Sequence, residues 1–238
     1  MHKMNDYFYR GAMMKCFAEA QQIAATSTDA DERTLAAKYL ALFEEYEYDK
    51  YPKITHDLER QSIERADESY EDLDEVQFIR THTDEADFKA CIAQLEQRAK
   101  EGTANERAAS FVVQGELFIL AHHYPEAVHC FQQAIAANPN KGLYWGLTGQ
   151  TMHRFGWMPF DALGFLEQAI QLDPKNSRWQ WNQALVLIQL AKDLQEPAFL
   201  ANAAVTLEDA LTYCREEQAS LKAAIQTTYD EMENYVFS

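Results

Sequence analysis

The sequence predicts an all-α protein whose helical hairpins stack into an α-α superhelix, and three observations lead to that prediction. Glycine and proline are scarce, at 8 and 6 in 238 residues, which is too little turn punctuation for a β-sandwich or barrel. Long stretches are rich in Ala, Leu, Glu, Gln and Lys, which favour helices. In the second half, small and large apolar residues recur every 34 to 35 positions, as expected for repeated helical pairs.

The chain begins with two expected helices, over residues 5–26 and 29–48. Ser27, Thr28 or Asp29 can cap the second of them, because short polar side chains accept hydrogen bonds from free N–H groups at a helix start. In the second helix, apolar side chains recur at helical spacing and predict one buried stripe. Its members are Leu35, Tyr39, Leu42, Phe43 and Tyr46.

Three further helices are expected before the repeats begin. Tyr51-Pro52 breaks the chain, and charged helices follow over about 55–71 and 73–80. The segment 84–101 is helical again, with apolar residues on one side. Gly102-Thr103-Ala104-Asn105 combines a glycine that can end a helix with small polar residues. It is therefore the predicted boundary between an N-terminal helical region and the repeats.

Charge excludes several classes of partner. The formal net charge is -17, and residues 29–75 hold 16 Asp and Glu against 6 Lys and Arg. Phosphate binding needs clustered Lys and Arg, so we expect neither nucleic acid nor an anionic membrane surface as a partner. The acidic stretch is either a solvated face or a docking surface for a basic partner.

Cysteine spacing and hydropathy predict a soluble, cytoplasmic protein. Cys16, Cys91, Cys130 and Cys214 are far apart and form no CxxC pair, which is typical of reduced thiols. The first residues contain no continuous apolar segment of the kind found in secretory signals. No run of 18 apolar residues exists, so membrane insertion is not expected.

The first half of the repeat unit is a helix with a central small residue. FVVQGELF, at 111–118, aligns with WGLTGQTM, at 145–152, and Gly115 then matches Gly149, 34 positions later. In a third and looser copy, Ala184 takes the glycine position. Small residues at these sites let a partner helix approach closely, while the large residues beside them fill the remaining space.

The second half of the unit is another helix, closed by proline. EAVHCFQQAIAANPN, at 126–140, aligns with DALGFLEQAIQLDPK, at 161–175, at an offset of 35 residues. Pro139 and Pro174 end this helix in the two copies. The third copy keeps the Ala-x3-Leu-x2-Ala spacing and lacks the proline; its members are Ala203, Leu207 and Ala210.

These two motifs, F-x2-QG-x2-F … A-x3-F-x2-A … P and its second copy, resemble the tetratricopeptide repeat (TPR) family. The resemblance implies that the pairs stack, because a pair of roughly 34 residues cannot bury its apolar face alone. It predicts the following organisation: an N-terminal helical region at 1–102, which degenerate repeats could occupy, then 103–238 with repeats at about 108–141, 142–176 and 177–214 and a capping helix at 218–236.

HHYPEAVHC, at 122–130, is rich in metal-ligand types but fits the turn of a helical hairpin better. In the repeat frame His122 and His123 fall between the paired helices, and His129 faces solvent next to Cys130. A zinc site needs about four converging ligands, and the sequence offers no second cluster. We expect no metal and no cofactor.

Catalysis is not expected either. His56-Asp57, and His82 with Asp84 and Glu85, place acid and base types together within a charged region where such neighbours arise by chance. The sequence has no glycine-rich phosphate loop, GxSxG elbow or HExxH motif. An enzyme that uses the acidic N-terminal half is kept as the hypothesis from another class.

The resemblance implies that the protein binds a polypeptide segment in the concave groove lined by the first helix of each pair. Members that grip a C-terminal carboxylate use Lys, Arg and Asn there, and this sequence offers little beyond Arg154, Arg178 and Asn182. An apolar, slightly acidic groove suits a segment with apolar anchors. The predicted groove row is Val112, Glu116, Ile119, Leu143, Gln150, His153, Trp181, Leu185 and Ile188.

Two functional hypotheses follow from this groove. The first is a non-enzymatic adaptor or scaffold that binds a partner polypeptide. The second is a dedicated cytosolic chaperone of a secreted or aggregation-prone client, similar to three-repeat bacterial secretion chaperones. The chain's own N-terminal helices or a second copy, which would make a homo-oligomer, are alternative occupants of the groove. Trp179 and Trp181 can be groove residues or simple core.

Overall fold

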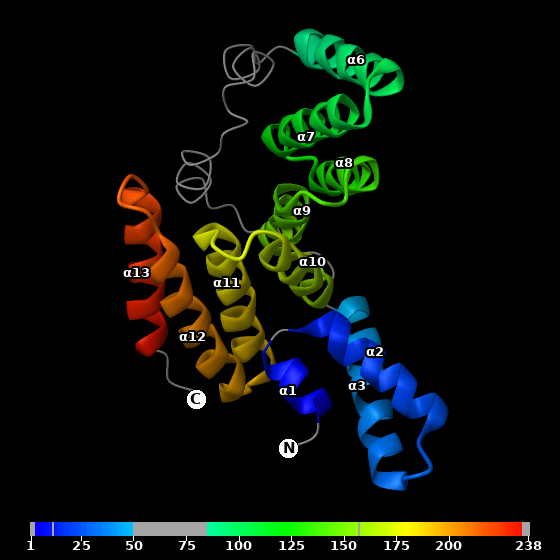
Figure 1. Ribbon diagram of the computed structural model, residues 1–238, viewed down its shortest axis with the longest axis vertical. Helices are drawn as coiled ribbons and strands as arrows, with labels where there is room; N and C mark the ends of the chain where they lie inside the picture. Colours follow the sequence, from blue (N-terminus) through cyan, green and yellow to red (C-terminus); the bar gives the residue numbers. More distant parts are fainter. Residues whose placement is uncertain (1–2, 11, 50–84, 157, 235–238) are drawn as a thin grey trace.

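The computed structural model describes residues 3–10, 12–49, 85–156 and 158–234, and within these ranges the chain forms helices and no strands (Figure 1). The predicted all-α class is confirmed. The predicted helices over 55–71 and 73–80 lie outside the described residues. The helices are α1 (Lys3–Tyr9), α2 (Met13–Thr26), α3 (Ala30–Asp49), α6 (Glu85–Glu101), α7 (Ala104–Leu120), α8 (Tyr124–Ala137), α9 (Gly142–Phe155), α10 (Pro159–Leu172), α11 (Ser177–Leu194), α12 (Pro197–Tyr213) and α13 (Ala219–Glu233).

The second half of the chain is a row of helical hairpins. The helices of α7–α8, α9–α10 and α11–α12 pack tightly within each pair, and each pair packs on the next through α8 against α9 and α10 against α11. Figure 1 shows this row turning gradually from α7 to α13. The architecture is an α-α superhelix, in which α13 follows the last pair at the end predicted for the capping helix.

Glycine and aromatic residues set the close approach inside and between the pairs. A Cβ atom added to Gly115 would overlap the Phe131 ring, and one added to Gly149 would lie 2.7 Å from the carbonyl oxygen of Ala162. Gly146 makes a similar contact between pairs, since its Cβ would lie 2.5 Å from the Trp179 ring. The small and large residues of the repeat therefore fit against one another, as the sequence predicts.

The exchange Gly115→Ala should destabilise the protein although alanine is the better helix former. The added methyl group has no space beside the buried Phe131 ring, and overpacking of this kind costs about 1–3 kcal/mol. Urea unfolding followed by circular dichroism measures the change. Ala136→Ser, on the exposed side of α8, is the control, and equal stability of both variants would contradict the packing described.

The predicted boundary at 102–105 is a short junction between two packed helices. Thr103 and Glu106 form a capping box at the start of α7: the Thr103 N–H donates to Glu106 Oε2 at 2.7 Å, and the Glu106 N–H donates to Thr103 Oγ1 at 3.4 Å. The helices on either side pack together through Leu95, Val113 and Leu117. α7 thus begins four residues before the predicted repeat start at 108.

This capping box predicts a pH-dependent contribution to stability. Hydrogen bonds from Thr103 lower the pKa of Glu106, so the folded state favours the ionised carboxylate. The contribution is complete above the pKa of glutamate in the unfolded chain and is lost as the pH falls through the lowered folded pKa. Glu106→Gln should therefore lower Tm at neutral pH and have no effect in acid. The exposed Glu216→Gln is the control; a pH-independent difference for Glu106→Gln would contradict the capping role.

The sequence predicts one continuous helix over 5–26, and this prediction is wrong. The structure has α1 and α2, with a break at which the Ala12 N–H donates to the Tyr7 carbonyl oxygen at 2.8 Å. The sequence has a glycine between the two helices, and glycine is a poor helix former. The break also lets α1 turn so that Met4 and Phe8 are buried.

The N-terminal helices pack on the second and third hairpins. α1 contacts α12, while α2 and α3 contact α10, so segments far apart in sequence lie side by side (Figure 1). The Phe8 ring lies 5.8 Å from the Phe160 ring and 5.1 Å from the Phe199 ring, and Lys15 pairs with Glu167 at 2.9 Å. These contacts join α1–α3 to the superhelix in one continuous core.

Candidate functional site

The nine residues of the predicted groove row lie on the first helices of the pairs, α7, α9 and α11. Five of them are buried and four are partly exposed. The buried ones are Val112, Glu116, Ile119, Gln150 and Trp181; the partly exposed ones are Leu143, His153, Leu185 and Ile188. As a binding surface the row stays a prediction.

Part of the predicted row meets around a small polar cavity. Glu116, Ile119 and Gln150 line a space of about 10 Å³, together with Arg178, which donates from Nη2 to Gln150 Oε1 at 2.8 Å. A space of this size holds about one water molecule, so this cavity has no room for a side chain of a partner. Trp181 is buried elsewhere and donates from Nε1 to Thr228 Oγ1 of α13 at 3.0 Å.

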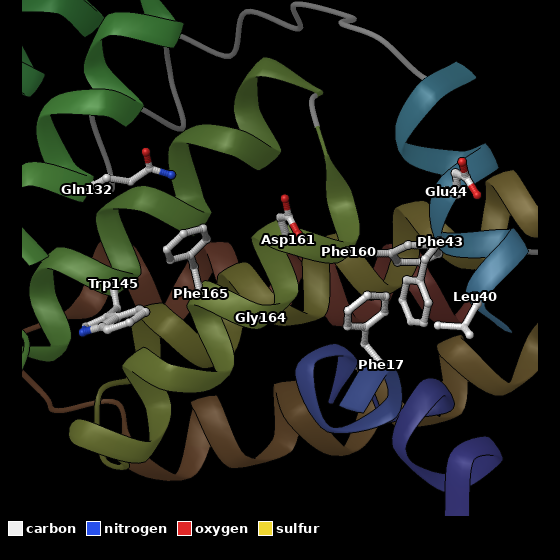
Figure 2. Close-up of a pocket in the computed structure, with 10 residues that line it drawn as sticks. All are labelled: Phe17, Leu40, Phe43, Glu44, Gln132, Trp145, Phe160, Asp161, Gly164 and Phe165. Carbon is white, nitrogen blue, oxygen red and sulfur yellow. The ribbon is translucent and has the colours of Figure 1, made fainter. Parts of the chain in front are cut away.

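A much larger space, which we call the aromatic basin, lies where α2 and α3 meet the second hairpin (Figure 2). Its volume is about 730 Å³, within the range of ligand-binding clefts. Half of its lining residues are aromatic. The lining comprises Phe17, Leu40, Phe43, Glu44, Gln132, Trp145, Phe160, Asp161, Gly164 and Phe165.

One side of the aromatic basin is built by the docked N-terminal helices. The Phe43 ring packs edge-on against two other rings: its centroid lies 4.7 Å from that of Phe160 and 5.7 Å from that of Phe17. Phe43 and Phe160 are buried, whereas Phe17 is 41% exposed. This arrangement holds the inner rings in place and leaves the outer ring available for contact.

The opposite side is built mainly by the second hairpin, with Gln132 of α8 beside it (Figure 2). The Trp145 and Phe165 rings lie 5.7 Å apart, and Trp145 Nε1 donates to the Pro139 carbonyl oxygen at 2.8 Å. Figure 2 shows Gly164 between this pair and the Phe17, Phe43 and Phe160 group. Two preformed aromatic walls thus face a floor that carries no side chain at Gly164.

Two carboxylates give the aromatic basin its electrostatic character. Glu44 and Asp161 are exposed lining residues from α3 and α10. Partial desolvation beside the apolar side chains raises the pKa of the Asp161 carboxyl above its ordinary value. None of the ten lining residues is Lys or Arg, so a cation placed in the basin would meet opposite charge without competition from the lining.

Sequence reasoning did not find the aromatic basin. The stripe with Phe43 predicts a buried face for α3 without indicating the surface that covers it. The one available signal is in the repeat alignment, where Gly164 and Phe165 stand at the positions of His129 and Cys130. An isolated glycine inside a helix is less stable than alanine there, so such a position is a candidate for close packing or for a functional role.

The histidine-rich segment forms the predicted hairpin turn. His122, at φ 62°, and His123 join α7 to α8, and His122 Nδ1 lies 3.3 Å from the Tyr124 hydroxyl. Within the described ranges, no three His, Cys, Asp or Glu side chains are grouped as a metal site would need. His56 and His82 lie outside those ranges, and so do Asp57 and Asp84.

Comparison with known proteins adds little to this picture. No family model and no curated protein matches the chain. A solved structure similar to it is the TPR2AB-domain:pHSP90-complex of yeast Sti1, with 15% sequence identity, a TM-score of 0.49, and 97% of this chain and 96% of that chain covered. At that level the likeness assigns neither ligand nor partner to the present chain. No helix in the described part is long and apolar enough to cross a membrane.

Proposed function

We propose that this protein is a non-catalytic adaptor that binds a segment of a partner polypeptide, and that the aromatic basin is the binding site. The observation that carries the proposal is the preformed basin of about 730 Å³ with five aromatic side chains in its lining. Aromatic residues supply a large contact area at low entropic cost and dominate binding energy at protein interfaces. Four widely spaced cysteines without a CxxC pair support a cytoplasmic location.

Preorganisation supports the same proposal. Both aromatic walls are fixed by ring contacts in the free protein, so little side-chain freedom is lost when a ligand binds. The partly exposed Phe17 and the bare floor at Gly164 leave room for apolar anchors from outside. The row of partly exposed residues on α9 and α11, such as Leu185, is the second candidate surface, as the repeat resemblance implies.

The test is a selection of random twelve-residue peptides displayed on phage against the full chain. Enriched peptides are then synthesised, and their affinities are measured by fluorescence anisotropy with wild-type protein and three variants. Phe17→Ser removes one exposed ring of the aromatic basin, Val205→Ser removes an exposed apolar side chain of α12, and Leu185→Asp changes the α11 surface.

Phe17→Ser should weaken binding about tenfold or more, since truncation of an aromatic hot-spot residue costs about 2 kcal/mol or more. Val205→Ser, 58% exposed in the free chain, should bind like wild type. If Leu185→Asp alone abolishes binding, the site is the row on the first helices and the aromatic basin is excluded. A client held at fixed stoichiometry, with no short peptide that binds reversibly, would favour the chaperone alternative.

A further inference from the structure

We infer that the polypeptide segment recognised by the aromatic basin carries a lysine or arginine between two apolar anchor residues. This inference rests on the proposed function, because it names the chemistry of the partner for that site. It is carried by the arrangement of the lining: two aromatic walls with carboxylates between and beside them (Figure 2).

Each of the two aromatic walls can bind one apolar anchor residue of the partner. In Figure 2 Trp145 and Phe165 lie on one side of Gly164, and Phe17, Phe43 and Phe160 lie on the other. A single apolar side chain can fill only one of these sites. A segment that crosses the glycine floor therefore covers both walls when an apolar residue stands near each of its ends, in an extended or helical conformation.

The carboxylates of the lining favour a positively charged residue between those two anchors. The Asp161 side chain stands between the two walls in Figure 2, and Glu44 lies beside the Phe43 wall. A cation that binds here offsets, by Coulomb attraction, the cost of the partial desolvation that raises the pKa of Asp161 in the free protein. Binding of an acidic or neutral segment would leave that cost in place or increase it.

Among the described residues, Lys15 at this junction is already engaged in an ion pair. Lys15 of α2 pairs with Glu167 of α10 at 2.9 Å, and this pair lies at the junction that forms the aromatic basin. Burial of Glu167, whose side chain is 12% exposed, favours keeping Lys15 as its partner. Lys15 is thus held by Glu167, a residue outside the lining of the aromatic basin.

The whole-chain charge selects the same class of partner. A net charge of -17 repels acidic polypeptides, including a second copy of this chain, and attracts basic ones over distances of about 10 Å at moderate ionic strength. Long-range attraction raises the association rate, and the local carboxylates then select the position of the cation. A homodimer through the basin would have to overcome this repulsion.

The experiment uses the full chain and a fixed set of labelled nine-residue peptides. Each peptide has Leu or Phe at two positions and Lys, Arg, Gln or Glu between them, with spacings of two, three and four residues between the anchors. Dissociation constants are measured by anisotropy at low and moderate salt. Asp161→Asn and Glu44→Gln remove the two lining charges, and Asp209→Asn removes an equal charge from the exposed face of α12.

The expected result is a preference for Lys and Arg peptides over the matched Gln peptides, and over Glu peptides by a larger factor. Each lining charge should contribute about two- to fivefold, as partly exposed ion pairs do. Asp161→Asn should reduce the Lys over Gln preference by that factor, and added salt should act in the same direction. Asp209→Asn should change the affinities for the Lys and Gln peptides by the same factor, so that the preference for Lys over Gln stays as in the wild type.

The outcomes separate this inference from the proposed function. If Lys, Gln and Glu peptides bind equally and Phe17→Ser weakens all of them, the aromatic basin binds polypeptides but the charge inference is overturned. If the Lys preference persists in Asp161→Asn and Glu44→Gln together, the cation is recognised elsewhere and the inference fails. If no peptide binds and concentration-dependent dimers lost in Phe17→Ser are found instead, the occupant is a second copy and both proposals fail.

Discussion

Phe8→Ala should release the N-terminal helices from the superhelix while leaving the repeats folded. Phe8 is 4% exposed and its ring contacts Tyr39, Phe160 and Phe199 at once, so it joins α1 to α3, α10 and α12. Truncation of a buried phenylalanine costs about 3–5 kcal/mol. Because this cost falls on one junction, we expect local undocking rather than global unfolding.

The thiol of Cys16 reports this undocking directly. Cys16 is completely buried in α2, its Sγ donates to the Met4 carbonyl oxygen at 3.5 Å, and burial raises the pKa of the thiol to about 12. In the wild type a thiol reagent should therefore modify it very slowly. In Phe8→Ala the rate should rise by a factor of about one hundred to several thousand, since each 1.4 kcal/mol of local stability lost is a factor of ten.

Two controls accompany this measurement. Cys130 of α8, whose pKa is also raised to about 12 by burial, should keep its slow rate in Phe8→Ala if the repeats stay folded. Tyr213→Ala, which removes an aromatic side chain that is 39% exposed, should leave both rates as they are. An unchanged Cys16 rate in Phe8→Ala would show that α1 does not hold the N-terminal helices in place.

Trp179→Ala should give the largest loss of global stability among single substitutions of the superhelix. The ring is 1% exposed, lies against the backbone of Gly146, and has the Arg178 guanidinium 4.9 Å from its centroid. It thus fills the contact between the second and third hairpins. Removal of this volume costs about 3–5 kcal/mol, because the flat surface at Gly146 has no side chain to refill the cavity.

The unfolding profile should change as well as the midpoint. Stability of a stacked-repeat protein depends on contacts between neighbouring units, so a weakened junction can split one transition into two. Guanidinium unfolding followed by circular dichroism and by tryptophan fluorescence would detect this. Trp179→Phe should recover part of the loss, and Leu120→Ala, at a 40% exposed site, should have little effect. If Trp179→Ala and the wild type each unfolded in a single transition with the same midpoint, the role of Trp179 would be contradicted.

The superhelix was predictable because its determinants are local and repeated. Gly115, Gly149 and Ala184 recur at matching positions of the first helix, and Phe131, Leu166 and Leu207 recur at matching positions of the second helix. Each unit specifies the same close approach, and repetition makes the pattern visible above the noise of a single sequence. The helices that carry these six residues pack into one core, as that pattern predicts.

The aromatic basin was not predictable for the opposite reason. Phe17 and Phe43 meet Phe160 and Phe165 across more than a hundred residues of chain, and no local pattern encodes which surfaces will meet. Helical spacing predicts that Phe43 lies on a buried face, but any apolar surface can satisfy that requirement. The residues of the predicted groove row lie on the first helices of the pairs, where tight packing buries Val112, Gln150 and Trp181.

The measurement that tests the central claim most directly is photo-cross-linking of a selected peptide to the full chain. One apolar anchor of the peptide is replaced by benzoyl-phenylalanine, the complex is irradiated, and the modified residues are identified by mass spectrometry. Binding in the aromatic basin predicts cross-links to α2 and α10, around Phe17 and Phe165. Cross-links confined to α7 and α11 would place the peptide on the predicted groove row and contradict the account.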